Sequence, residues 1–149
     1  MIYTSSYSNC NTNEYNLVSI SGDRGKSVNF NGDYFPELAP KKTFWEVWHN
    51  NIGKVGYDNN NKYYIEEYYN QVLSKLNVEN VYKELDNSIL LCYESNAEFC
   101  HRHIVAAWFE LLLGVDVKEV IISESNIKEL YRPNYIKQYL SKRLVKTYK

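Results

Sequence analysis

The sequence predicts an α/β fold: a small, open, Rossmann-like and mostly parallel sheet of about four or five strands, flanked by helices and followed by a basic C-terminal helix. Two observations favour this class. The run "NSILLCYE" (residues 87–94) is apolar almost throughout, which is typical of a strand covered on both faces in a parallel sheet. In residues 61–76, apolar side chains recur at the three-and-four spacing of a core-facing helix. Other segments of the two kinds alternate along the chain.

The remaining strands are expected in residues 1–6 ("MIYTSS"), 17–21 ("LVSIS") and 118–123 ("KEVIIS"). Their β-branched and aromatic residues favour extended backbone, and turn-forming residues follow the first two. Residues 26–42 contain glycine and prolines, and their apolar residues show no regular helical or strand spacing. We therefore expect an ordered loop there.

Helix boundaries are indicated by capping residues. Thr43 and Glu46 have the spacing of a capping box at the start of "TFWEVWHNN", and Asn77 precedes "VENVYKEL" as an N-cap. Ser95 and Glu98 repeat the box spacing, so we expect the helix "AEFCHRHIVAAWFELLL" to begin there. Its apolar character predicts burial, and Gly114 is expected just after its last residue, as the C′ glycine.

The last segment, residues 133–149, predicts an amphipathic basic helix docked on the domain, with Pro133 in its first turn. Its narrow apolar stripe consists of Ile136, Tyr139, Leu140 and Leu144. Six basic residues and no acidic one lie in 132–149, so this part carries about +6 and the remainder about −7. The basic residues are Arg132, Lys137, Lys142, Arg143, Lys146 and Lys149. The helix either docks with its lysines in water or contacts a nucleic-acid backbone.

Length and composition indicate one folded α/β domain over residues 1–149, because 44% of the residues are hydrophobic and a chain of this length can bury one core. The three cysteines have no disulfide-scaffold spacing, which is typical of a reducing compartment. No apolar run is long enough to cross a membrane, and the N-terminal segment lacks the features of a signal peptide. We expect a cytoplasmic protein without membrane contacts.

Candidate site residues cluster where strands end, which is where open α/β sheets bind ligands. They are Ser5 and Ser6 after the first strand, Arg24 after the second, and Cys92, Glu94, Cys100, His101 and Arg102 at and after the apolar strand. Arginine presents a planar fork of donors that suits phosphate or carboxylate. The set therefore predicts a crevice that binds an anionic small molecule, such as a nucleotide, or a nucleic acid.

The block "LLCYE…CHRHIVAAW", with weaker matches at "VSISGDRG" and "ELAP", resembles the uncharacterised family DUF 488. The resemblance covers roughly residues 1–122. It implies a small α/β fold and carries over Cys92, Cys100, His101 and Arg102 as signature positions. The loop "SGDRGKS" departs from the family's more basic, proline-containing turn, so the resemblance does not extend to Arg24. It implies no activity.

Each candidate also has a structural interpretation. Cys92 and Cys100 can be core residues, because buried cysteine behaves as a small hydrophobe. Near a helix start, however, Cys100 gains a lowered pKa and can be reactive. His101 and His103 point in different directions on a helix, so at most one works with Cys100, and the resemblance favours His101. Arg102 either contacts the ligand or pairs with an acidic residue such as Glu98.

Metal ligation is not predicted, because the cysteine spacing is unlike the usual pairs and neighbouring side chains on a helix diverge. No cofactor is predicted either. Three functions remain open. The chain is an enzyme in which Arg24 and Arg102 hold the anion, Ser5 and Ser6 assist them, and Cys100 or His101 reacts. Alternatively, it is a non-catalytic nucleic-acid-binding module, or a regulatory partner protein whose cysteine–histidine block only packs the core.

Overall fold

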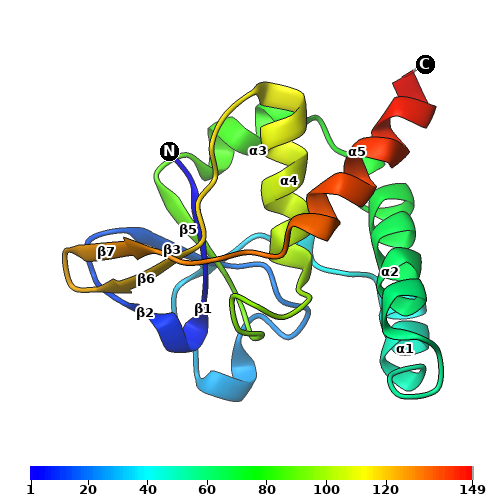
Figure 1. Cartoon of the computed structure of the whole chain (residues 1–149). Helices are drawn as coiled ribbons and strands as arrows, with labels where there is room; N and C mark the ends of the chain where they lie inside the picture. The colour runs from blue at the N-terminus through cyan, green and yellow to red at the C-terminus, as the bar shows by residue number, and fades with distance from the viewer. Residues whose placement is uncertain (149) are drawn as a thin grey trace.

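The computed structural model describes residues 1–148 and has a four-stranded parallel sheet at its centre, in the order β1–β5–β3–β4 (Figure 1). Its strands are β1 (Tyr3–Ser6), β3 (Asn16–Ser19), β4 (Asp33–Tyr34) and β5 (Ser88–Cys92). All residues of β5 are buried, as its apolar run predicts. The predicted α/β class is confirmed. Only β4 falls in a segment expected to be a loop.

A second, smaller sheet joins the strand predicted at 118–123 to two others. Strand β6 (Val120–Ser123) pairs in parallel with β2 (Cys10–Asn11) and antiparallel with β7 (Asn126–Glu129). An isolated bridge between Thr4 and Glu119 connects β1 with the residue before β6. This bridge places Glu119 beside the central sheet, which becomes important for the site.

Within residues 1–148, five α-helices follow the predicted segments with shifted ends. They are α1 (Lys42–Asn50), α2 (Tyr57–Gln71), α3 (Val78–Leu85), α4 (His101–Leu113) and α5 (Asn134–Tyr148), and short 3-10 turns lie at Tyr7–Asn9, Lys26–Val28, Pro36–Leu38 and Leu73–Lys75. Figure 1 shows the helices gathered on one side of the central sheet, with β6 and β7 projecting from the other.

Two of the predicted capping boxes are wrong. Helix α1 starts after Lys41 without a side-chain cap, and the Thr43 hydroxyl instead donates to Gln71 of α2. Ser95 and Glu98 do interact, through their side chains at 2.9 Å, but they form a turn in a loop. The predicted caps at Asn77 and Gly114 are confirmed.

The large core lies between the helices and the central sheet. It contains the Tyr64–Ile65 and Tyr68–Tyr69 pairs of α2 and most of α4. A smaller cluster around Ile89, Leu91 and Ile122 covers the opposite face of the sheet, with tyrosines packed against it. Both faces of β5 are therefore buried, although helices cover only one of them.

Helix α5 packs on α2 and α4 through its apolar side. Ile136, Leu140 and Leu144 are buried, and Tyr139 is half-buried. These are the residues of the stripe identified in the sequence. None of the helices in residues 1–148 has both the length and the apolar character needed to span a bilayer.

Candidate functional site: a cysteine–histidine centre in a cavity

Cys100 occupies the N-cap of α4, and the helix begins at His101 rather than near Ser95. The Cys100 backbone is extended, with φ −154° and ψ 144°. Cys100 therefore does not have the side-chain direction of a helical residue, and it stands at the N-terminal end of α4, where first-turn N–H groups have no partner inside the helix. Those groups and the helix dipole favour negative charge. The sequence analysis placed Cys100 inside the helix. A residue there would have helical backbone angles and would not be the N-cap.

A cavity of about 530 Å³ opens beside Cys100 at the carboxyl edge of the sheet. Its floor contains Cys92 at the end of β5, together with Cys100 and His101. The other lining residues are Ser21, Gly22, Asp23, Ser27, Pro40, Lys42, Trp45, Trp48, Tyr64, Tyr93, Glu94 and Phe99. Its volume lies within the range typical of small-molecule sites.

His101 is held by contacts at both ring nitrogens. Its Nε2 lies 2.7 Å from the carbonyl oxygen of Ile20, which can only accept, so Nε2 carries a hydrogen. Its Nδ1 lies 3.6 Å from Sγ of Cys92. The Tyr68 ring packs edge-on against the imidazole at 5.6 Å. This fixed orientation turns Nδ1 toward the two thiols.

The environment favours Cys100 as thiolate and Cys92 as thiol. Burial alone would raise the pKa of Cys100, but hydrogen bonding from Cys92, the Arg102 charge and His101 outweigh it and hold this pKa well below its ordinary value. The hydrogen bond to Cys100 and burial raise the pKa of Cys92 well above its ordinary value. Burial would lower the pKa of His101, yet the interaction with Cys100 raises it overall. The arrangement therefore suits a thiolate–imidazolium pair.

Two carboxyl groups line the cavity in different states. Burial and the nearby Cys100 charge raise the pKa of Glu94 to about 7, and the Cys92 thiol lies 3.7 Å from its Oε2. Burial of Asp23 acts in the same direction, but hydrogen bonds from Tyr93, Gly25 and Ser27 lower its pKa to about 2. Glu94 can thus exchange a proton near neutral pH, whereas Asp23 stays ionised.

Three soft donors in this cluster could hold a metal. The Sγ atoms of Cys92 and Cys100 and a ring nitrogen of His101 lie within 4.8 Å of one another, and all three residues are buried. Two thiolates and an imidazole suit Zn²⁺, with a further position open to the cavity. The prediction that Cys100 and His101 diverge is wrong, because Cys100 lies before the helix.

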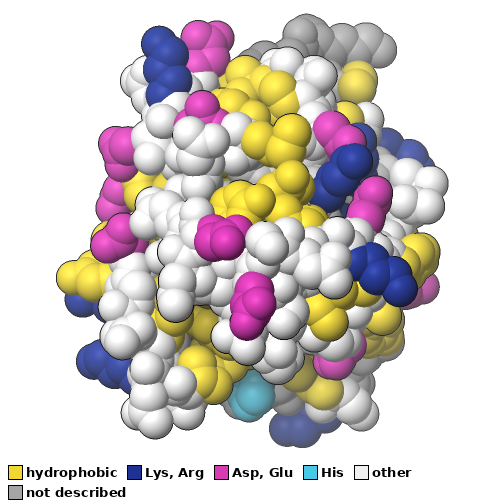
Figure 2. Space-filling model, turned by 90° about the vertical axis from the view of Figure 1, so that its left-hand side faces the viewer, with side chains coloured by type: hydrophobic (Ala, Val, Ile, Leu, Met, Phe, Trp, Pro, Cys, Tyr) yellow, Lys and Arg dark blue, Asp and Glu magenta, His cyan; other side chains and the backbone are white. Residues whose placement is uncertain are grey.

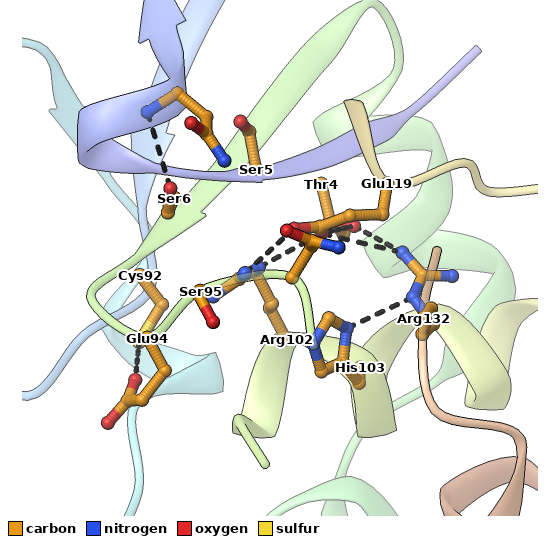
Figure 3. A network of polar contacts seen from close by, with 12 residues as sticks. Thr4, Ser5, Ser6, Cys92, Glu94, Ser95, Arg102, His103, Glu119 and Arg132 are labelled. Atoms are coloured by element: carbon orange, nitrogen blue, oxygen red, sulfur yellow. Dashed lines mark hydrogen bonds and ion pairs between the residues drawn. The ribbon is translucent and has the colours of Figure 1, made fainter. Parts of the chain in front are cut away.

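Arg102 points away from the cavity into a second, buried polar network (Figure 3). Its Nε and Nη2 donate to the two carboxylate oxygens of Glu119 at 3.0 and 2.7 Å. Thr4 and Arg132 also contact Glu119. Arg102 thus pairs with Glu119 rather than Glu98, and its enclosed side chain lies outside the cavity lining. Its charge still acts on the Cys100 thiolate.

The other predicted anion-binding residues also lie outside the cavity lining. Ser5 donates to the carbonyl oxygen of Val120 at 2.6 Å, and the Ser6 hydroxyl caps the 3-10 turn that follows it. Arg24 is exposed, and its guanidinium lies 4.3 Å from the centre of the Tyr34 ring. The positions of Ser5 and Ser6, which are fully buried, therefore do not fit the expectation of direct ligand contacts.

Sequence reasoning missed the aromatic wall and the acidic partner. Trp48 packs against Phe99 and Tyr64, with ring centres 5.7 and 5.3 Å apart, and it donates to Asn61. Trp45 is 39% exposed at the cavity. A signal for the tryptophans existed in "TFWEVWHNN", since two of the three tryptophans lie there. No sequence motif near Glu119 indicates its role, because folding alone brings it next to Arg102.

The fold and the site together define a class: an α/β protein with a cysteine–histidine centre at the carboxyl edge of a parallel sheet. The model of the DUF488-N3a family, described as the active DUF488-N3 subclade, matches residues 9–112, which is well over half of the chain. The chain therefore belongs to the DUF488 family, and the resemblance seen in the sequence is confirmed. No curated protein and no solved structure matches it.

Proposed function

We propose that this protein is a cysteine-dependent enzyme whose cavity binds a ring-containing anionic ligand of the nucleotide type, with the Cys100 thiolate as the nucleophilic group beside it. The observation that carries the proposal is the position of Cys100. It caps α4, faces the cavity and lies among Cys92, His101 and the Arg102 charge. Such surroundings stabilise a thiolate, which is the nucleophilic form of cysteine.

Glu94 is suited to move the proton in this reaction. It lines the cavity, its carboxylate lies next to the Cys92 thiol, and its pKa of about 7 lets it give and take a proton at neutral pH. His101 acts as the cationic partner of the thiolate, because its Nε2 remains bound to the Ile20 carbonyl oxygen. Arg102 is a positioning residue, since it acts through Cys100 and touches no ligand.

The walls of the cavity support the ligand class. Trp45 and Trp48 offer flat apolar surfaces on which a planar ring can stack. Lys42 is the basic residue of the lining, and its side chain is 84% exposed. We place the ring among the aromatic side chains and the anionic group near Lys42, in place of the arginines expected from the sequence. Asp23, which stays ionised, disfavours an anion at the opposite wall.

Alkylation of Cys100 tests this proposal without a known substrate. Iodoacetamide should modify Cys100, and a mixture of the common nucleoside monophosphates at millimolar concentration should slow that modification several-fold, as measured by peptide mass spectrometry. Trp45→Ala should weaken the protection. Val47→Ala is the matched control, because Val47 lies in the same helix with 42% exposure and does not line the cavity.

Lys42→Ala separates the two parts of the ligand. Protection by nucleoside monophosphates should fall, whereas protection by free nucleosides should not change. Absence of protection by any nucleotide would contradict the ligand class. Stoichiometric zinc in the purified protein, lost in Cys92→Ser and Cys100→Ser, would contradict the nucleophile and favour a metal-dependent reaction at the same three donors.

The nucleic-acid-binding alternative finds less support. Of the basic residues in the C-terminal segment, Lys137 pairs with Glu110, Arg143 pairs with Glu66, and Arg132 is directed inward to Thr4 and the Val117 carbonyl oxygen. Figure 2 shows acidic and basic side chains interspersed on the side of β6 and β7, which is not the side of α5. Lys149 lies outside the described residues.

A further inference from the structure

Cys92 and Cys100 form a pair of thiols with unlike surroundings at one end of the cavity. Their Sγ atoms lie within 4.8 Å of each other. Cys92 is fixed at the end of β5, whereas Cys100 follows an irregular loop (93–99) and precedes α4. A disulfide has an S–S distance of about 2 Å, so bond formation requires a movement of the Cys100 side chain and of this loop. The third thiol, Cys10, lies in β2 of the other sheet.

We propose that Cys92 and Cys100 form a reversible disulfide when a hydroperoxide enters the cavity, with Cys100 oxidised first and Cys92 resolving it. The cavity gives a small oxidant access to Cys100, although its side chain has little exposure to bulk water. Redox-active cysteines are thiolates with a resolving thiol nearby, and this pair meets both conditions.

The chemistry proceeds in two balanced steps. The Cys100 thiolate attacks one peroxide oxygen, so an S–O bond forms, the O–O bond breaks, and the leaving hydroxide or alkoxide takes a proton from Glu94 or water. Cys100 is then a sulfenic acid, oxidised by two electrons, and the peroxide is reduced. The Cys92 sulfur next attacks the Cys100 sulfur, and the S–O bond breaks. Hydroxide leaves with the Cys92 proton as water, and a disulfide remains.

Figure 3 shows Glu94 directed to Cys92, which supports the second step. The carboxylate lies 3.7 Å from the Cys92 thiol and can accept its proton as the thiol attacks. The disulfide would remove the Cys100 thiolate and so stop the proposed reaction. This consequence rests on the proposed function, whereas disulfide formation does not.

Counting thiols tests the inference. The reduced chain has three cysteines, and a few equivalents of hydrogen peroxide should leave one free thiol, counted after unfolding. The intact mass should fall by about 2 Da for the loss of two hydrogens. Peptide mapping should join Cys92 to Cys100, and dithiothreitol should restore both thiols. Cys10 should stay reduced, because burial raises its pKa to about 11.

Single variants assign the roles. Cys92→Ser should stop at a Cys100 sulfenic acid that dimedone traps, and Cys100→Ser should keep both remaining thiols. Cys10→Ser should lose its two thiols as fast as the wild type loses the same pair. Oxidation of Cys10 at an equal rate, a disulfide between two chains, or survival of all three thiols would each overturn the inference. Loss of nucleotide protection without loss of the disulfide would instead refute only the proposed function.

Discussion

At the residue scale, the identity of the reactive cysteine depends on one backbone feature. Cys100 has extended φ and ψ and stands immediately before α4, so its sulfur meets both the helix N-terminus and His101. The sequence identified Cys92, Cys100 and His101 as candidates, and the structure brings all three together at the cavity. The role of Arg102 could not be derived, because its partner Glu119 is separated from it by an intervening helix and loop.

Glu94 provides a test at the same scale through the pH dependence of stability. Its pKa in the folded chain is raised from an ordinary value of 4.5 to about 7, so the protonated carboxyl stabilises the fold. This contribution is fully present below the unfolded pKa and is lost as the pH rises through 7. Glu94→Gln should therefore stabilise the chain relative to wild type more at pH 8 than at pH 5, measured by urea unfolding.

Glu94→Ala also removes the ionisable group, so its stability relative to wild type should likewise be higher at pH 8 than at pH 5. A difference between Gln and wild type that is the same at both pH values would show that Glu94 titrates normally. Glu94 would then be ionised at neutral pH and could not donate the proton in the proposed reaction.

At the element scale, capping signals predicted some boundaries correctly and misled at others. Asn77 accepts a hydrogen bond from the Asn80 N–H, and Gly114 adopts a positive φ of 67°. Both act within their own helix, so the local sequence determines them. Ser95 and Glu98 bond side chain to side chain rather than side chain to backbone as in a capping box, and the chain is not helical there. Tyr93, Glu94 and Phe99 of this segment line the cavity instead. Tertiary packing decided that boundary.

The Arg102–Glu119 pair links α4 to the start of β6, and both side chains are fully buried. Removing one partner of a buried pair leaves an unpaired charge, so Arg102→Met should cost about 3–5 kcal/mol of unfolding free energy. Lys137–Glu110 is a comparison pair between α5 and α4 in which the Lys137 side chain is 49% exposed, so Lys137→Met should cost at most about 1 kcal/mol. Denaturant unfolding measures both.

The same Arg102 variant should also slow alkylation of Cys100, because it removes a charge that lowers the pKa of this thiol. Equal costs for the two variants would contradict the inferred burial of the Arg102 charge. Unchanged alkylation in a folded Arg102→Met protein would contradict its role as a positioning residue.

At the scale of the whole molecule, the site is a consequence of topology. The parallel strands β1, β3 and β5 all end at one edge, and aromatic side chains from α1, α2 and the loop before α4 enclose the cavity there. Hydrophobic periodicity predicts the strands and helices in the sequence, and parallel pairing then predicts the edge. The aromatic wall could not be predicted, because it depends on how α1 and α2 pack beside the sheet.

The second sheet could not be predicted from the sequence, because its pairing depends on distant segments. Residues 118–123 were assigned to a strand correctly, but β6 extends a separate sheet and thereby places Glu119 beneath Arg102. Helix α5 docks through the predicted stripe, and its basic residues partly pair with α2 and α4. The charge asymmetry of the sequence is thus reduced by internal ion pairs.

The most direct test of the central claim is the alkylation rate of each cysteine as a function of pH. Iodoacetamide modification at Cys100, Cys92 and Cys10 can be followed separately by peptide mass spectrometry, with the unfolded chain as reference. Cys100 should react fastest at pH 7, and its rate should level off well below pH 9, because its pKa is lowered. Cys10 should stay nearly unreactive at pH 7. If Cys100 reacts no faster than Cys10, or reacts only above pH 9, the protein has no reactive thiolate at this site.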